Sequence, residues 1–379
     1  MTSRPYARRL AANILVPFAI ALVLLGLLEV GCRAALRLRT GAWPRTRAEE
    51  YRRFVEKVGS AYERHPYLVV AGRPNAVLRV PGHEVRLNAR GQRGAMPAMP
   101  KPKGRFRVVC EGGSTTLDLL APDDAHTWPQ RLGELLAPHD ADVVNAGFAG
   151  WTSVESLVSL ELKDVDTEPD LVVVFSGAND LQPAGHVPFA RDYALGHGEI
   201  LPRVLGVAPI PLTLASRSLL AEKILDLVSP GAARTEGYAP AWEWSGGARK
   251  GDIPQAAVDV FARNLRSTIG VARAHGAGTL LVAQTVVARK GKEKADDEWL
   301  ESWTPGLTPT GYKRGLARYD AAAKHVAESA GAFFLDPFAG GSFGDEDFAD
   351  PLHFSSAGSE RFARLLASWI EERLPALRR

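Results

Sequence analysis

Short apolar runs alternate with longer amphipathic stretches from residue 105 to the C-terminus. Such runs are typical of buried strands in a parallel sheet whose two faces are covered by helices. The runs are Phe106–Cys110, Asp142–Asn145, Leu171–Phe175, Thr279–Ala283 and Ala332–Leu335. The helical stretches are Thr127–Leu136, Ser153–Lys163, Ala256–Ala274, Arg314–Ser329 and Ala357–Arg373. The pattern predicts a three-layer α/β/α fold that binds its ligands at the carboxyl ends of the strands.

A long apolar segment lies near the N-terminus. Leu10–Leu28 is apolar except for Asn13. A membrane-spanning helix needs about 20 such residues, and the core of a cleaved signal peptide about 7–15. No small-x-small cleavage site follows, and Glu29 fits poorly at the first position of the lipoprotein-like box that ends at Cys32. We therefore expect residues 1–31 to form a tail and one transmembrane helix. A cleaved signal peptide and lipidation at Cys32 are the alternatives.

Charge is distributed unevenly along the chain. Residues 1–105 carry a net charge of +14 and the remainder −11, within a total of +3 over 379 residues. The basic part lacks aromatic-rich RNA motifs, zinc-ligand spacings and a recognition helix, so nucleic acid is not an expected partner. Attraction to anionic lipid headgroups explains this positive charge more simply. More arginines follow the apolar segment than precede it, which favours a cytoplasmic C-terminal side, but long domains are translocated regardless of flanking charge.

Two regions are expected beyond the anchor. Residues 32–104 begin with an arginine-rich helical pattern and continue as short extended pieces separated by prolines and glycines, which we interpret as a basic stem and linker. Residues 105–379 form the α/β domain.

Two segments interrupt the alternation within this domain. Residues 183–253 separate the third strand from the next helix and are interpreted as an inserted cap. Residues 288–310 form a second, polar loop. Each segment carries two tryptophans, Trp242 and Trp244 in the first and Trp299 and Trp303 in the second.

Two of the motifs that follow strands suit nucleophilic catalysis. Gly113-Ser114 follows the first strand, where a serine can be exposed at the start of a helix. Asp350-Pro351-Leu352-His353 follows the fifth strand, and its spacing lets Asp350 turn back onto the ring of His353. Ser114 could instead cap a helix, and His353 could be a loop histidine beside a solvated acid. The same Asp-x-x-His spacing recurs at Asp123–His126, on the first loop, which is the wrong place for a base that follows the last strand.

Two further motifs could supply hydrogen-bond donors. Asn179, after the third strand, could donate from its amide to a developing oxyanion, although an Asx turn is the alternative. Gly147, after the second strand, could donate its backbone N–H, or could be an ordinary turn glycine.

Taken in order, these motifs resemble the SGNH (GDSL-like) hydrolase family from about Arg105 to Leu374. The resemblance implies a five-stranded parallel sheet of flavodoxin-like order. It also implies Ser114 as nucleophile, His353 as base supported by Asp350, and Gly147 and Asn179 as oxyanion donors. The first motif reads Gly-Gly-Ser where the namesake pattern has Gly-Asp-Ser-Leu, which puts a plain lipase assignment in doubt.

The expected function is therefore a serine-dependent hydrolase of acyl or acetyl esters, with carbohydrate as a possible carrier of the acyl group. An O-acyltransferase acting on a cell-envelope glycan is the first alternative. A non-catalytic glycan-binding protein is the second, and the intact set of four motifs argues against it. No cofactor is needed, and no convincing metal-ligand spacing occurs. Membrane-tethered relatives act in the cell envelope, so we expect an extracytoplasmic domain on a single-pass anchor. The sequence leaves the oligomeric state open.

Overall fold

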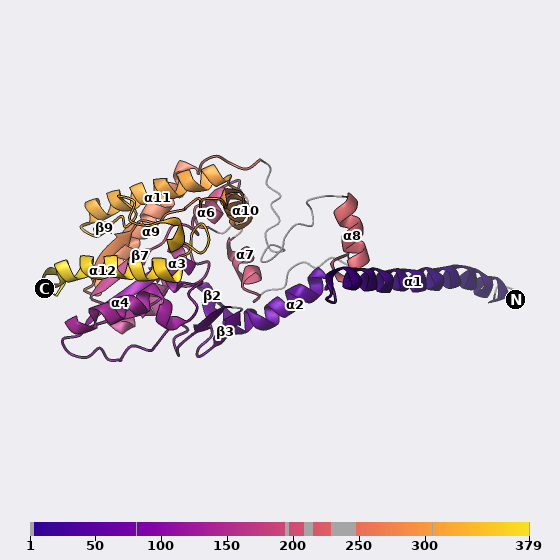
Figure 1. Ribbon diagram of the computed structural model, residues 1–379, viewed down its shortest axis with the longest axis horizontal. Coiled ribbons are helices and arrows are strands. Elements are labelled where there is room, and N and C mark those ends of the chain that lie inside the picture. Colours follow the sequence, from indigo (N-terminus) through magenta and orange to yellow (C-terminus); the bar gives the residue numbers. More distant parts are fainter. Residues whose placement is uncertain are drawn as a thin grey trace. The chain divides into compact units, whose positions relative to one another are not determined.

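The computed structural model describes residues 4–80, 82–193, 197–207, 215–228, 248–304 and 306–378 (Figure 1). The chain divides into two compact units. Residues 1–56 and 209–238 form the first unit, and residues 57–208 and 239–379 form the second. The predicted boundaries at residues 31 and 104 remain predictions.

The first unit is built on helix α1 (Arg4–Thr40). Within α1, Leu15–Thr40 has a mean hydropathy of 2.4 in its most apolar window and is long enough to cross a membrane, although a signal sequence has the same properties. Its leucine, valine and phenylalanine side chains are exposed. The unit also contains α8 (Leu219–Val228) and all but the last residue of α2 (Arg47–Lys57).

Glu29 follows the apolar stretch of α1 and caps a helix that is distant in sequence. Its carboxylate accepts hydrogen bonds from Ser218 Oγ at 2.8 Å and from the backbone N–H groups of Leu219 and Leu220 at 3.0 and 2.9 Å. These are N–H groups that the first turn of α8 cannot satisfy itself. The acid that follows the apolar segment therefore fixes the start of α8.

The second unit contains the predicted five-stranded sheet, which is confirmed. Its strands are β5 (Phe106–Gly112), β6 (Ala141–Asn145), β7 (Leu171–Phe175), β8 (Gly278–Val282) and β9 (Phe333–Leu335). All neighbours pair in parallel in the order β6-β5-β7-β8-β9. The first strand thus lies between the second and the third, which is the flavodoxin-like order.

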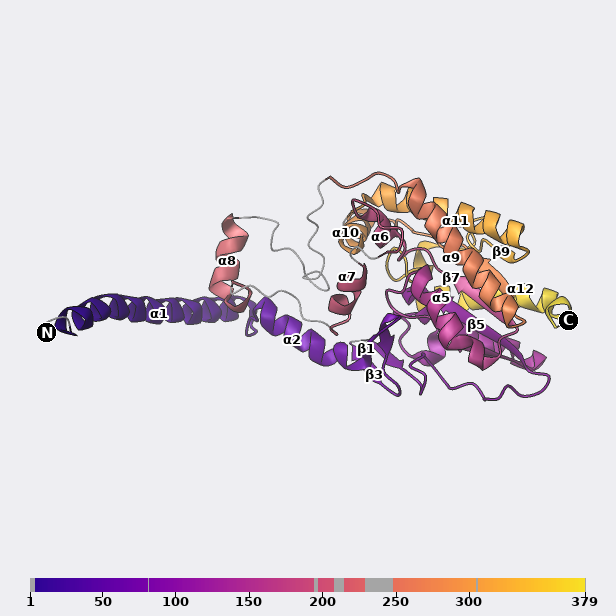
Figure 2. The same ribbon diagram turned by 180° about the vertical axis from the view of Figure 1, so that it is seen from behind.

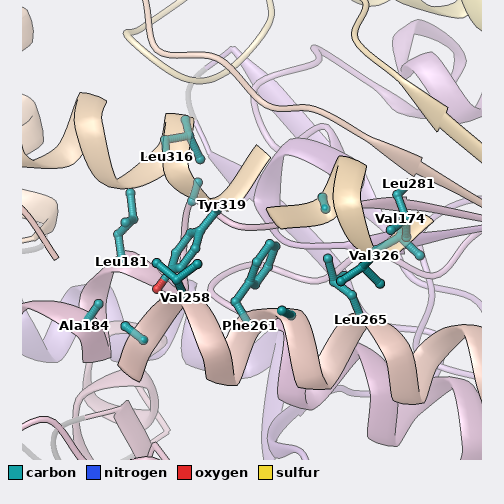
Figure 3. Close-up of a cluster of buried hydrophobic side chains, with 14 of the residues drawn as sticks. Val174, Leu181, Ala184, Val258, Phe261, Leu265, Leu281, Leu316, Tyr319 and Val326 are labelled. Carbon is teal, nitrogen blue, oxygen red and sulfur yellow. The ribbon is translucent and has the colours of Figure 1, made fainter. Parts of the chain in front are cut away.

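Helices cover both faces of this sheet. Figures 1 and 2 show α4 (Trp128–Leu136) and α12 (Ser356–Leu377) on one face, and α9 (Gln255–Ala274) and α11 (Pro309–Ala330) on the other. Side chains of β7 alternate between the two cores: Leu171, Val173 and Phe175 pack toward α4 and α12, whereas Val172 and Val174 pack toward α9 and α11. Figure 3 shows the second of these cores, with Val174, Phe261 and Tyr319 among its members.

The remaining helices in the described part of the second unit, together with η5, span 3 to 11 residues. The α-helices are α3 (Ser114–Leu117), α5 (Ser153–Leu162), α6 (Leu181–Gly185), α7 (His197–Val204) and α10 (Glu293–Trp303). The 3-10 helices are η1 (Gly59–Ala61), η2 (Asp124–His126), η3 (Ala137–His139), η4 (Asp164–Thr167), η5 (Ala215–Arg217) and η7 (Asp345–Asp347). The predicted polar loop at 288–310 thus contains α10, and part of the predicted cap contains α7 and α8. Trp242 and Trp244 lie outside the described residues.

Two β-hairpins precede the sheet within the same unit. β1 (Tyr62–His65) pairs with β2 (Val69–Gly72), and β3 (Val77–Val80) pairs with β4 (His83–Arg86), both antiparallel. Pro66 lies in the turn between β1 and β2, and Gly82 in the turn between β3 and β4. The buried Arg93 ties this region to the sheet: Arg93 Nε donates to Asp124 Oδ1 at 2.8 Å and Nη1 to the Asp118 carbonyl at 2.6 Å.

Trp128 is the largest fully buried side chain, and we predict that Trp128→Ala lowers the free energy of unfolding by about 3–5 kcal/mol. Its ring packs edge-on against Phe175 and Phe362 at centroid distances of 6.3 and 5.0 Å, and its Nε1 donates to the Thr115 carbonyl at 2.9 Å. The measurement is urea unfolding of the full chain in detergent. As a control, Trp43→Ala removes a ring that is 58% exposed and whose main contact is with the Arg37 guanidinium, and it is expected to cost at most about 1 kcal/mol. Equal losses for the two variants would contradict the prediction.

Candidate active site

Ser114 is the first residue of α3, directly after the carboxyl end of β5. The preceding glycines make this turn possible. Gly112 has φ +152°, and a Cβ there would lie 2.2 Å from the Phe175 carbonyl oxygen. A Cβ on Gly113 would lie 2.4 Å from Asn179 Nδ2. The absence of a side chain at Gly113 therefore lets the amide of Asn179 approach the backbone next to Ser114.

His353 and Asp350 lie on the loop between η7 and α12. Ser114 Oγ is 2.7 Å from His353 Nε2, and His353 Nδ1 is 2.7 Å from Asp350 Oδ2. The other carboxylate oxygen, Oδ1, accepts the backbone N–H groups of Leu352 and His353, each at 2.8 Å. Because a carboxylate can only accept, Nδ1 carries a proton, and Nε2 is left to accept the proton of the Ser114 hydroxyl.

The electrostatic environment favours a protonated His353. Burial by itself lowers the pKa of His353, but the charge of Asp350 and its hydrogen bond outweigh burial and raise it. The pKa of Asp350 is lowered, because the charge and hydrogen bonds of His353 outweigh the effect of burial. The pair is therefore arranged to stabilise an imidazolium once His353 has taken up a proton.

Asn179 follows β7, and its amide lies beside Gly113, the residue before Ser114. One N–H of Nδ2 donates to the Trp151 carbonyl at 2.8 Å, which leaves the second N–H available. Trp151 is itself held by a hydrogen bond from its Nε1 to the Val70 carbonyl at 2.9 Å. The β1–β2 hairpin therefore supports the residue that orients Asn179.

Gly147 is the other predicted oxyanion donor, and that role stays a prediction. Its N–H donates to Asn145 Oδ1 at 3.1 Å, so it is already engaged. A Cβ on Gly147 would lie 2.4 Å from the Leu117 backbone nitrogen, which means that Gly147 permits close packing on α3. Gly150, three residues later, lines a cavity together with Asn179. Gly147 is the first glycine after β6, and Gly150 is the second.

Gln284 was not among the predicted site residues. Its Nε2 donates to Thr115 Oγ1 at 2.8 Å, and its Oε1 accepts the Ala178 N–H at 2.7 Å. Thr115 and Ala178 are the neighbours of Ser114 and Asn179, so Gln284 fixes the spacing of the two loops that carry them. The available signal was a polar residue just beyond a buried strand, in the same position relative to β8 as Ser114 has relative to β5.

The other acids have local partners. Asp118 Oδ2 accepts the Trp128 N–H at 2.7 Å and Ser359 Oγ at 2.6 Å, and Asp180 Oδ1 accepts Tyr193 OH at 2.9 Å. In the second Asp-x-x-His motif, His126 Nδ1 lies 2.6 Å from Asp123 Oδ1, and both side chains are largely exposed. Among the described residues, no group of three or more His, Cys, Asp or Glu side chains could hold a metal ion.

The chain is similar to proteins of known structure and matches one family model. None of the curated proteins is similar enough to match the chain. Solved structures of similar fold include a GDSL-like lipase from Bacteroides thetaiotaomicron, with 14% identity over 73% of this chain and 92% of that one and a TM-score of 0.40. A catalytic mutant of an acetylxylan esterase from Geobacillus stearothermophilus has 16% identity over 69% and 93%, with a TM-score of 0.40. A lipase/acylhydrolase from Enterococcus faecalis has 17% identity over 71% and 96%, with a TM-score of 0.40.

The GDSL-like lipase/acylhydrolase family matches residues 110–361, which contain Ser114, Asn179, Asp350 and His353. With this match spanning most of the second unit and its parallel sheet, the chain belongs to the GDSL-like lipase/acylhydrolase family.

Proposed function

We propose that the protein is a serine-dependent ester hydrolase that works through an acyl-enzyme on Ser114. The observation that carries this proposal is the continuous hydrogen-bonded chain from Ser114 Oγ through His353 to Asp350, with both contacts at 2.7 Å. A nucleophile in hydrogen-bond contact with a base, itself oriented by a carboxylate, is the arrangement that activates a serine.

The reaction has two halves. His353 Nε2 takes the proton of Ser114 as Oγ attacks the ester carbonyl. The Ser114 N–H and the free N–H of Asn179 Nδ2 bind the resulting oxyanion, and His353 then returns the proton to the leaving alcohol. In the second half, His353 deprotonates a water that attacks the acyl-enzyme, and Ser114 regains its proton when the carboxylic acid leaves.

Aromatic rings beside the base support a carbohydrate as the carrier of the acyl group. The Trp299 ring lies 5.9 Å from the His353 ring, and the Trp299 and Trp303 rings stack at 6.3 Å with 20° between their planes. Flat aromatic faces suit sugar rings as either leaving group or acceptor. Acyl transfer to a cell-envelope glycan is therefore the second candidate, and it predicts that added glycan speeds turnover and becomes acylated while the release of free acid falls.

We further propose that α1 is an uncleaved membrane anchor and that the hydrolase domain lies outside the cytoplasm. Length and apolar character support the anchor. Protease added to intact spheroplasts is expected to digest the hydrolase domain. Protection in intact spheroplasts, with digestion only after lysis, would reverse the topology, and an N-terminus found beyond residue 31 would show cleavage instead of anchoring.

We predict that Ser114→Ala and His353→Ala each reduce kcat for 4-nitrophenyl acetate by several orders of magnitude without unfolding the protein. Residues of one catalytic unit act together, so the double variant should be little worse than either single one. Asn179→Ala should lower kcat by about 10²–10³ through the loss of one oxyanion donor. Steady-state rates and circular dichroism of each purified variant provide the measurement.

The matched control is His126→Ala, which removes the histidine of the other Asp-x-x-His motif and should leave kcat within about twofold. An essential His126 together with a dispensable His353 would show that the base has been assigned to the wrong histidine.

The raised pKa of His353 predicts the acidic limit of activity. His353 must be neutral to accept the proton of Ser114, so kcat/KM rises as pH increases through its pKa, above the ordinary histidine value of about 6.5. Asp350→Asn removes the charge that raises this pKa, so the rise of kcat/KM with pH should move to lower pH. The value of kcat should fall by roughly 10⁴-fold, because the imidazole is no longer held in the correct tautomer. The test is the pH profile of kcat/KM for both proteins. A rise of kcat/KM that stays at the same pH in the variant, or moves to higher pH, would contradict the prediction.

A further inference from the structure

Helix α8 presents an uncovered apolar face. The large apolar side chains in its second half, Ile224, Leu225, Leu227 and Val228, are 52%, 41%, 81% and 75% exposed. Among the described side chains of α8, only that of Leu219, at its start, is buried. A helix of 10 residues is marginal in water unless its apolar side is packed. A further surface is therefore expected to cover this face.

The start of α8 is held at one end of the apolar segment of α1. The helical rise over Leu10–Leu28 is about 28 Å, close to the thickness of about 30 Å of the hydrocarbon core of a bilayer. Glu29 follows directly, and its carboxylate accepts the N–H groups of Leu219 and Leu220. With α1 as the proposed anchor, the first turn of α8 lies where acyl chains meet headgroups.

The direction of α8 suits that depth. Figures 1 and 2 show α8 crossing the axis of α1 instead of running along it, and both helices belong to the first unit. A helix that crosses a spanning helix runs along the plane of the membrane. An amphipathic helix in that plane buries its apolar side about 5–10 Å deep, between headgroups and acyl chains. The position and the direction of α8 are therefore those of an interfacial helix.

Other residues of the same unit suit lipid headgroups. Beyond the apolar segment, a cavity has a lining that includes four arginines, two glutamates and Trp43. The arginines are Arg33, Arg45, Arg52 and Arg53. The Trp43 ring is 58% exposed, and the Arg37 guanidinium lies 4.4 Å from its centroid. Tryptophan is enriched at the level of the headgroups, and arginine is attracted to their negative charge. These side chains fit the headgroup layer, and the apolar face of α8 fits the acyl chains beneath it.

We propose that α8 is an interfacial helix whose apolar face, formed by Ile224, Leu225, Leu227 and Val228, is covered by phospholipid at the end of α1. The inference rests on the proposed membrane anchor. It gives the protein a second membrane contact, made by a segment inserted between β7 and β8 of the hydrolase domain. The chain passes between the two units on both sides of this segment as well as after α2, so the hydrolase domain is joined to the membrane-bound unit at three points.

The test measures which side of α8 is reached by lipid, using the full-length protein in nanodiscs of phosphatidylcholine and phosphatidylglycerol. In a Cys32→Ser background the other native cysteine, Cys110, is buried and does not react. Val228→Cys is labelled with a fluorophore, and Lys223→Cys is the matched control, because these two exposed positions differ by about 140° around the helix. Nitroxide lipids should quench the Val228→Cys label about threefold more strongly than the Lys223→Cys label, and aqueous iodide about threefold less.

A second labelled position checks that the result belongs to the whole apolar face. Ile224→Cys lies one turn before Val228 and should give the same result as Val228→Cys. Iodide that quenches Val228→Cys and Lys223→Cys equally would overturn the inference. A Val228→Cys label shielded from both quenchers would also overturn it, and energy transfer between labelled copies would then identify a second copy as the cover.

A label at Leu22→Cys, in the middle of the apolar segment, tests the anchor separately. If nitroxides deep in the bilayer do not quench this label, the proposed anchor itself fails. If they quench it while nitroxide lipids leave Val228→Cys unquenched, the anchor holds and only the interfacial helix is rejected.

Discussion

The hydrogen bond between Ser114 and His353 is 2.7 Å long and joins two residues that lie 239 positions apart in sequence. The fold of the second unit must hold these two residues in contact. The parallel sheet brings the ends of β5 and the last loops to one edge, but a sheet edge alone does not fix a side-chain contact. Asp118 supplies a direct link. It ends α3, accepts the Trp128 N–H at the start of α4, and accepts Ser359 Oγ in the first turn of α12. The helix that carries the nucleophile is thus tied to the helix that follows the base.

This link places a carboxylate in the core near a histidine, which has an electrostatic consequence. Burial raises the pKa of Asp118 to about 6, although the hydrogen bonds from Ser359 and Trp128 and the charge of Arg93 act in the opposite direction. Asp118 is therefore ionised at neutral pH and adds to the negative potential around His353, where its charge acts in the same direction as that of Asp350. A residue whose first role is to join three helices also contributes to the charge that His353 experiences.

The sequence was sufficient for the sheet and for the catalytic motifs, because both depend on local patterns. Five apolar runs predicted five strands to within about two residues, and the three-residue spacing of Asp350 and His353 predicted their contact. The sequence could not predict contacts between loops. Nothing local distinguishes Gly147, whose N–H is used by Asn145, from Gly150, which lines a cavity with Asn179. Gln284 acts through Thr115 and Ala178, which are 169 and 106 residues away, and no periodicity encodes such a bridge.

A β-hairpin before the sheet supports a residue of the candidate active site, although its sequence looks like a linker. Val70 in β2 accepts the indole N–H of Trp151, and the carbonyl of Trp151 orients the amide of Asn179. A primary amide has one donor arm and one acceptor arm, so fixing the donor arm also decides where the acceptor points. The N–H groups of Asn179 lie toward Gly113 and the Trp151 carbonyl, and its oxygen is left without a partner among the described residues. The hairpin thus supports the hydrogen bond that orients the Asn179 amide beside Gly113.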